Sequence, residues 1–119
     1  MSTNKRDTET VEHGDITITV GVASILMGMQ RSIAKGEAFR ASKEGKVEPA
    51  QRILAIVTYP DLVASVVEAD GIPWPLEFED FLELPEVLVT RWEEAAYRLN
   101  PHWLPGYDEE AAEEAEKKE

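Results

Sequence analysis

The chain of 119 residues contains no cysteine and only two histidines, His13 and His102. Disulfides, zinc–thiolate sites and thiol nucleophiles are therefore excluded. No further ligand type gathers near either histidine, so we expect no metal site and no cofactor. The HExxH, GxSxG, Walker and GxGxxG patterns are also absent. These absences predict a protein that is not an enzyme.

Long apolar runs are lacking as well. The longest candidate, ILAIVTYPDLVASVV, is interrupted by Tyr59, Pro60 and Asp61, whereas a membrane helix needs about 18 uninterrupted apolar residues. Residues 1–15 are polar and have no apolar run like that of a signal peptide. We expect a soluble protein without membrane contacts, and a flexible leader over residues 1–15.

Positive charge is scarce, because 12 basic residues stand against 24 acidic ones and give a net charge of −12. This balance opposes binding to nucleic acid or to anionic lipid. Seven acidic and two basic residues fall in 106–119, which contribute −5 of the total. The sequence therefore predicts an acidic disordered tail over 106–119 and a single helical domain over 16–105.

The clearest helix follows Pro85. Its apolar residues recur at offsets of three and four and so share one stripe: Leu88, Trp92, Ala95, Ala96 and Leu99. Proline is favoured in a first helical turn, and Asn100-Pro101 ends the helix because proline disfavours the α conformation in the residue before it.

Shorter elements precede that helix. Ile16, Ile18 and Val20 alternate with threonines and predict one strand. The next residues predict a helix over 24–39 capped by Ser24. A second helix follows Pro49; Pro60 kinks or divides it, and it continues over 61–69. An ordered turn over 70–75 then buries Trp74, and a short helix precedes Pro85.

The predicted fold is mainly α, a small single-domain helical bundle with one short N-terminal β-strand. A lone strand has open edges and needs a partner, so we also predict a homo-oligomer. The predicted core consists of Leu26, Met29, Ile33, Leu54, Val57, Leu62, Val66, Phe81, Leu88, Trp92 and Leu99.

Several methionines and aromatics have two interpretations, core packing or contact with a partner. Methionines adapt to irregular surfaces, and aromatics away from an apolar stripe often meet partners. The candidate partner-binding residues are Met27, Met29, Trp74, Tyr97, Trp103 and Tyr107. Carboxylates that could pair on helices, such as Glu79 with Glu83 or Glu86 with Glu93 and Glu94, lie on polar sides and are interpreted as solvated rather than catalytic.

Three motifs resemble the tail assembly chaperones of long-tailed bacteriophages and prophages. They are MGMQRS at the first helix, YPDLVASVVE in the middle, and a Phe-rich segment with Leu-Pro-Glu that leads into WEEAAYRLNP. The similarity extends over about residues 16–104. The resemblance implies a small, mainly helical, non-enzymatic protein in the host cytoplasm. Such a protein binds the tape measure protein and is displaced when tail tube subunits polymerise.

The resemblance also implies a minus-one ribosomal frameshift near the end of the gene. Glu116-Lys117-Lys118 can be encoded as GAA AAA AAG, which contains a slippery heptamer. Lys117 and Lys118 are therefore the candidate frameshift positions, although a lysine pair that simply ends an acidic tail explains the same residues. A nucleotide sequence without the heptamer and the overlapping frame would remove this hypothesis.

Two other classes remain as alternatives. An acidic inhibitor that imitates DNA requires carboxylates spaced like phosphates, but the predicted helices mix acids with basic residues. Deleting the residues after Tyr107 should abolish the effect of such a tail-driven mimic. A structural head–tail or tube subunit should instead form ordered rings in isolation, which light scattering would detect.

Overall fold

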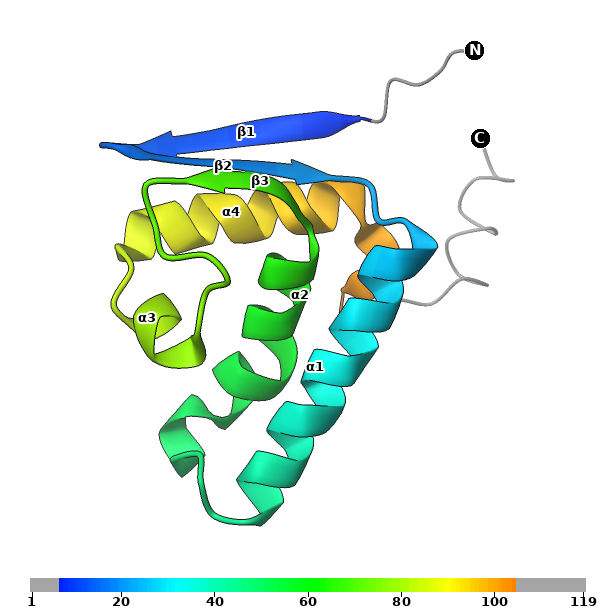
Figure 1. The fold of residues 1–119 in the computed structure, drawn as a ribbon, viewed down its shortest axis with the longest axis vertical. Helices are drawn as coiled ribbons and strands as arrows, with labels where there is room; N and C mark the ends of the chain where they lie inside the picture. Colours follow the sequence, from blue (N-terminus) through cyan, green and yellow to red (C-terminus); the bar gives the residue numbers. More distant parts are fainter. Residues whose placement is uncertain (1–6, 105–119) are drawn as a thin grey trace, which may run out of the picture.

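Three antiparallel strands form one sheet in the order β1–β2–β3 (Figure 1). The computed structural model describes residues 7–104. The strands are β1 (Thr8–His13), β2 (Ile16–Gly21) and β3 (Val66–Asp70). The helices are α1 (Ile25–Lys43), α2 (Tyr59–Ala64), α3 (Phe78–Leu82) and α4 (Glu86–Leu99), with a π-helical turn η2 (Leu54–Thr58) and two 3-10 turns, η1 (Pro49–Gln51) and η3 (Pro101–Trp103).

The predicted helical bundle with a single strand is wrong, because the chain forms a three-stranded sheet packed against helices. The predicted strand is β2, at the centre of the sheet. β1 lies in the segment predicted as a flexible leader, and β3 lies in the predicted helical continuation 61–69. β1 has one aliphatic residue, Val11, so its own sequence gives a weak strand signal. Pairing with β2 stabilises both flanking strands.

The central position of β2 removes one argument for a homo-oligomer. β1 pairs with it from Thr8↔Gly21 to His13↔Ile16, and β3 pairs along its other edge. The partner that the lone strand required is therefore supplied twice by the same chain. The homo-oligomer stays a prediction without this support.

One face of the sheet packs on α4 and the other faces solvent (Figure 1). Val11, Ile18 and Val20 are buried toward the helix. The alternate positions carry threonines and acids, and the hydroxyl oxygens of Thr10 and Thr19 lie 3.3 Å apart on the outer side. Apolar and polar residues thus alternate as expected for a half-buried antiparallel sheet.

The apolar stripe of α4 forms the centre of the core, as predicted. Leu88, Trp92, Ala95 and Ala96 are all buried, and the helix ends at Leu99 before Asn100-Pro101. The ring of Phe81 meets that of Trp92 edge-on at 6.3 Å between centroids. The core cluster comprises Val11, Ile18, Val20, Leu62, Leu76, Phe81, Leu88, Trp92, Ala95 and Ala96.

The predicted interruption at Pro60 appears as a change of helix type. The N–H of Tyr59 donates to the carbonyl of Leu54, five residues back, which gives the π-helical turn η2 that precedes α2. Because Pro60 has no N–H, it cannot bond the carbonyl of Ile56 four residues back. Lys35 Nζ donates to that carbonyl instead, at 3.2 Å.

Four predicted core residues are exposed. Leu26, Met29 and Ile33 lie on the solvent side of α1, which has no buried residue, and Leu54 is 37% exposed. The predicted cap of α1 is confirmed, since Ser24 Oγ accepts the N–H of Met27 at 3.2 Å. The cap residue therefore identified the start of α1, but the prediction placed the apolar residues of this helix in the core, whereas they lie on its exposed face.

The turn after β3 depends on Gly71. Its φ is +88°, and a Cβ at this position would lie 2.3 Å from the carbonyl oxygen of Asp15. We expect Gly71→Ala to destabilise the fold by about 1–2 kcal/mol through the left-handed backbone conformation, with the steric contact adding to it. Gly36→Ala is the control, because nothing lies within 4 Å of its added Cβ. Urea unfolding of both variants tests this, and equal midpoints would contradict it.

Candidate functional site

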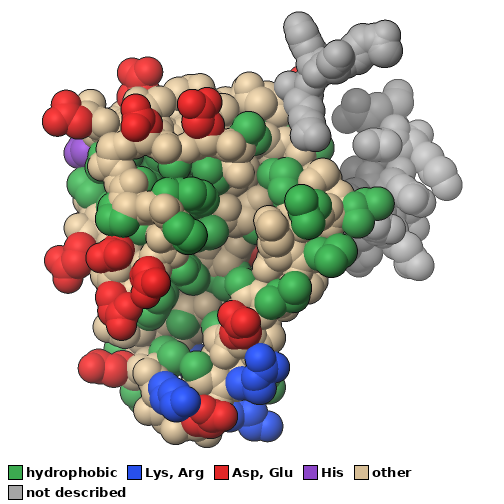
Figure 2. Space-filling model, viewed as in Figure 1, with side chains coloured by type: hydrophobic (Ala, Val, Ile, Leu, Met, Phe, Trp, Pro, Cys, Tyr) green, Lys and Arg blue, Asp and Glu red, His purple; other side chains and the backbone are tan. Residues whose placement is uncertain are grey.

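Helix α1 exposes an apolar face near its N-terminus. The exposed fractions are 86% for Ile25, 60% for Leu26, 55% for Met29 and 57% for Ile33. Residues three and four apart lie together on a helix, so these four side chains form one patch, which we call the α1 face. Figure 2 shows hydrophobic side chains gathered over this part of the molecule. An exposed apolar patch is a candidate contact surface.

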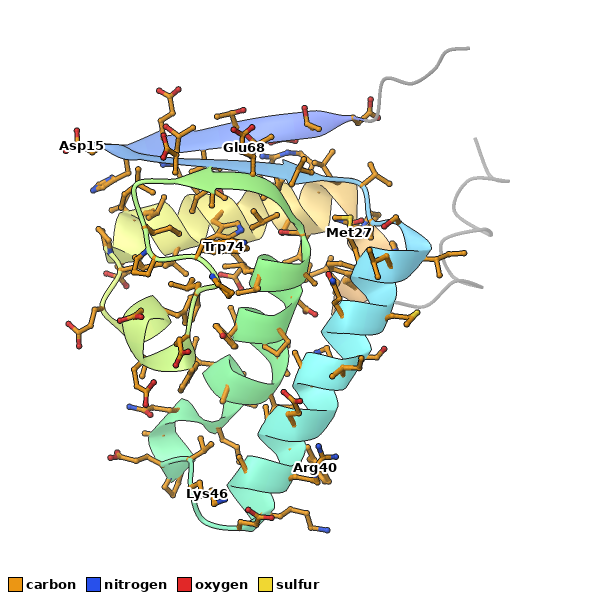
Figure 3. The ribbon with its side chains drawn as sticks, viewed as in Figure 1. Asp15, Met27, Arg40, Lys46, Glu68 and Trp74 are labelled. Carbon is orange, nitrogen blue, oxygen red and sulfur yellow. The ribbon has the colours of Figure 1, made fainter. Side chains whose placement is uncertain are left out.

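An apolar hollow lies beside α1. It has a volume of about 310 Å³, and Trp74, which is 44% exposed, forms part of its wall. The predicted burial of Trp74 is therefore wrong, although the predicted turn is present. The lining comes from α1, from α2 and from the loop before α3: Gln30, Ala34, Pro60, Val63, Ala64, Val66, Trp74 and Pro75. Figure 3 shows Trp74 in the space between the sheet and α3.

A second hollow of about 290 Å³ continues along α1 from the first. Ala34 lines both, and the second is further lined by Glu37, Ala38, Ala41, Val47, Ala55, Tyr59 and Phe78. Alanines form its α1 wall, and aromatic rings stand opposite. We call the two hollows together the Trp74 groove. Small side chains in such a groove allow the backbone of a bound helix to approach closely.

The groove lies between regions of opposite charge. Basic residues gather at the far end of α1, where Figure 3 labels Arg40 and Lys46, and acidic residues dominate the sheet end, where it labels Asp15 and Glu68. Figure 2 shows the basic side chains at the lower end of this side, with acidic ones among them, and acidic side chains without basic ones near the sheet. A partner on this side meets an apolar surface bordered mainly by acids toward the sheet.

A buried carboxylate fastens α1 to the rest of the domain. Asp61 is fully buried on α2, and its Oδ1 accepts from Arg31 Nε at 2.5 Å, with Lys35 Nζ at 3.5 Å. Tyr97 on α4 donates its hydroxyl to Asp61 Oδ2 at 2.5 Å. Burial, with this hydrogen bond next, raises the pKa of Tyr97. α1 thus keeps its place through polar contacts, while its large apolar residues stay outside.

Trp103 supports the same cluster from the C-terminal side. It is buried in η3, and the guanidinium of Arg31 lies 4.7 Å from its ring centroid. A cation above an indole face is favourable. The cluster of Asp61, Arg31, Lys35, Tyr97 and Trp103 is therefore structural, and it holds the α1 face in place.

A third cavity, of about 500 Å³, lies between η2 and α4. Its apolar lining consists of Ile53, Val57, Tyr97 and Leu104, and its polar lining of Thr58, Thr90, Glu93 and Glu94. Burial raises the pKa of Glu93, and the neighbouring charge of Glu94 adds to the rise. We call this cavity the Glu93 pocket.

The predicted partner-binding residues separate into three groups. Met29 and Trp74 lie on the apolar surface just described. Tyr97 and Trp103 belong to the Asp61 cluster, and the sulfur of Met27 accepts the N–H of Ser24 at 3.4 Å. Tyr107 lies outside the described residues, as do Lys117 and Lys118, the candidate frameshift positions.

Asp61 is the structural residue that the sequence interpretation missed. In the sequence it only interrupts an apolar run, yet it is the one acidic residue within 53–67. A charge in such a run is rarely buried unless it is paired, and Arg31 and Lys35, four residues apart, were available on the preceding helix. This spacing is the signal that could have found the cluster.

Within residues 7–104, no group of three or more acidic or histidine side chains is arranged to hold a metal ion. No helix in that range is long and apolar enough to cross a membrane. In comparisons with protein-family models, curated proteins and solved structures, none matches this chain.

Proposed function

We propose that the chain is a tail assembly chaperone of a long-tailed bacteriophage, which binds the helical tape measure protein in the host cytoplasm before tail tube subunits replace it. The observation that carries this proposal is the α1 face beside the Trp74 groove. The core of the domain is complete without these side chains. An apolar surface that the fold does not use for itself is available for a partner.

The shape of this surface suits a helix. α1 has 19 residues, and the groove follows it along two joined hollows that share Ala34. Amphipathic helices bind in such grooves through apolar side chains on successive turns. Tape measure proteins are long and helical with much apolar surface, and they would self-associate if left uncovered. The net charge of −12 would keep the complex in solution.

The test is co-expression of the chain with the tape measure protein of the same phage. Ile33→Glu places a charge at the C-terminal end of the α1 face, and Val87→Glu places the same charge at a site of equal exposure on α4, at 57% and 58% respectively. Burying one isoleucine contributes about 1.5–3 kcal/mol, so Ile33→Glu should weaken binding roughly ten- to a hundred-fold. Val87→Glu should bind like the original chain.

The readouts are the amount of tape measure protein in the soluble fraction and its co-purification with the chain. Circular dichroism of both variants checks that they fold. A tape measure protein that stays insoluble with the original chain would contradict the proposal, as would equal rescue by the two folded variants.

A further inference from the structure

The Glu93 pocket is separate from the Trp74 groove and lies on another side of η2. Ile53, Val57 and Thr58 line the pocket, whereas Ala55 and Tyr59 line the groove. A volume near 500 Å³ lies within the range of about 300–1,000 Å³ that is typical of ligand sites. The pocket therefore has room for more than one side chain of a partner.

Its apolar part is open to solvent. Ile53 is 70% exposed and Leu104 is 44% exposed, and neither belongs to the core cluster. With Val57 they form an aliphatic wall next to the ring of Tyr97, whose hydroxyl is already engaged by Asp61. This wall offers burial for methylene and methyl groups but few hydrogen bonds.

The charged part of the pocket has no counter-ion among the described residues. Neither Glu93 nor Glu94 forms an ion pair within 7–104. The two arginines next to them on α4 are engaged elsewhere: Arg98 pairs with Glu9 at 2.8 Å, and Arg91 donates to the carbonyl of Glu12 at 2.6 Å. Glu93 is half-buried, and its pKa is raised first by burial and then by the neighbouring charge of Glu94.

An aliphatic wall beside two unpaired carboxylates complements a lysine or arginine side chain, because its stem is apolar and its end is cationic. The net charge of the chain's own tail is unfavourable for this site. Residues 105–119 follow Leu104 at the rim, but they carry seven acids against two lysines, so their net charge matches that of the pocket in sign.

We propose that the Glu93 pocket is a second docking surface that takes a basic amphipathic segment of the helical partner, with an aliphatic side chain against Ile53 and Leu104 and a lysine or arginine end group at Glu93. This inference rests on the proposed function. The inference adds a chemical requirement to the proposed function. The α1 face and the Trp74 groove select apolar helices, whereas the Glu93 pocket selects basic ones.

The test uses two synthetic amphipathic helices of 18 residues with the same leucine stripe, one with lysines and one with glutamines at its flanking positions. Calorimetry should show that the original chain binds the lysine peptide about ten-fold more tightly than the glutamine peptide, as expected for a partly desolvated charge pair. Glu93→Gln should abolish this preference. Glu68→Gln, which removes the same charge from the sheet, should keep it.

Amide NMR shifts locate the contact. The lysine peptide should shift Val57, Thr90 and Leu104, and Glu93→Gln should remove those shifts. If both peptides bind equally and shift only α1 and the Trp74 groove, this inference is overturned while the proposed function stands. If neither peptide binds, both are overturned. If n-hexylamine alone binds as tightly as the lysine peptide with the same shifts, the pocket is a small-amine site and the assignment to a peptide is overturned.

Discussion

Replacing Asp61 by alanine should destabilise the domain by about 3 kcal/mol, because removing one partner of a buried ion pair leaves the others uncompensated. Asp61 is fully buried. It accepts from Arg31 and Tyr97 and forms an ion pair with Lys35 at 3.5 Å, and these partners come from two different helices. Arg31 and Lys35 keep 21% and 25% of their side chains exposed and can partly turn to water. This places the cost near the lower end of the range for buried pairs, about 3–5 kcal/mol.

The loss of stability caused by Asp61→Ala should be greatest in α1. This helix buries no residue of its own, so without Asp61 its contacts with α2 are mainly those of alanines. Hydrogen exchange should therefore quicken along α1 more than along α4, and urea unfolding should give the overall change in free energy. Glu9→Gln is the control, because the Glu9–Arg98 pair is exposed and exposed pairs contribute little. If both variants unfold at the same urea concentration, the structural role of Asp61 is wrong.

α4 shows what could be predicted from sequence. Its apolar spacing, its start after Pro85 and its end at Asn100-Pro101 all depend on neighbouring residues, and all are confirmed. β1 and β3 could not be found in this way, because the pairing that forms them joins positions far apart, such as Thr17 and Asp70. A segment with one aliphatic residue becomes a strand only when its partner is known.

The candidate site shows a different limit of prediction from sequence. The periodicity in α1 correctly grouped Met29 with Ile33, but periodicity does not tell which face turns inward. In the fold α1 lines the groove with alanines and with Gln30 and Glu37, while its large apolar side chains are exposed. The assumption that large apolar residues form the core fails on α1, where they lie exposed on the outside of the fold. Met29 was predicted both as a core residue and as a candidate contact, Trp74 both as buried and as a candidate contact, and Leu26 and Ile33 as core residues only.

Asn100 carries the second large stability effect that we expect. Its side chain is fully buried and joins two segments: Oδ1 accepts the N–H of Ala23 at 2.8 Å, and Nδ2 donates to the carbonyls of Gly21 at 3.0 Å and Ala96 at 3.1 Å. The amide thus connects the end of β2 with the last turn of α4. The sequence predicted only that this residue ends a helix.

Asn100→Ala should cost about 2–4 kcal/mol, because each buried backbone group left without a partner costs about 1–3 kcal/mol and water can reach some of them after the change. Thermal and urea unfolding measure the loss, with His102→Ala as an exposed control two residues away. Asn100→Asp tests the mechanism, because it keeps the acceptor for Ala23 but sets a carboxylate against two carbonyl oxygens. That arrangement favours the protonated acid in the folded state, so the penalty of Asn100→Asp should shrink as the pH falls. A penalty independent of pH, or an Asn100→Ala variant as stable as the original chain, would show that the amide does not join these segments.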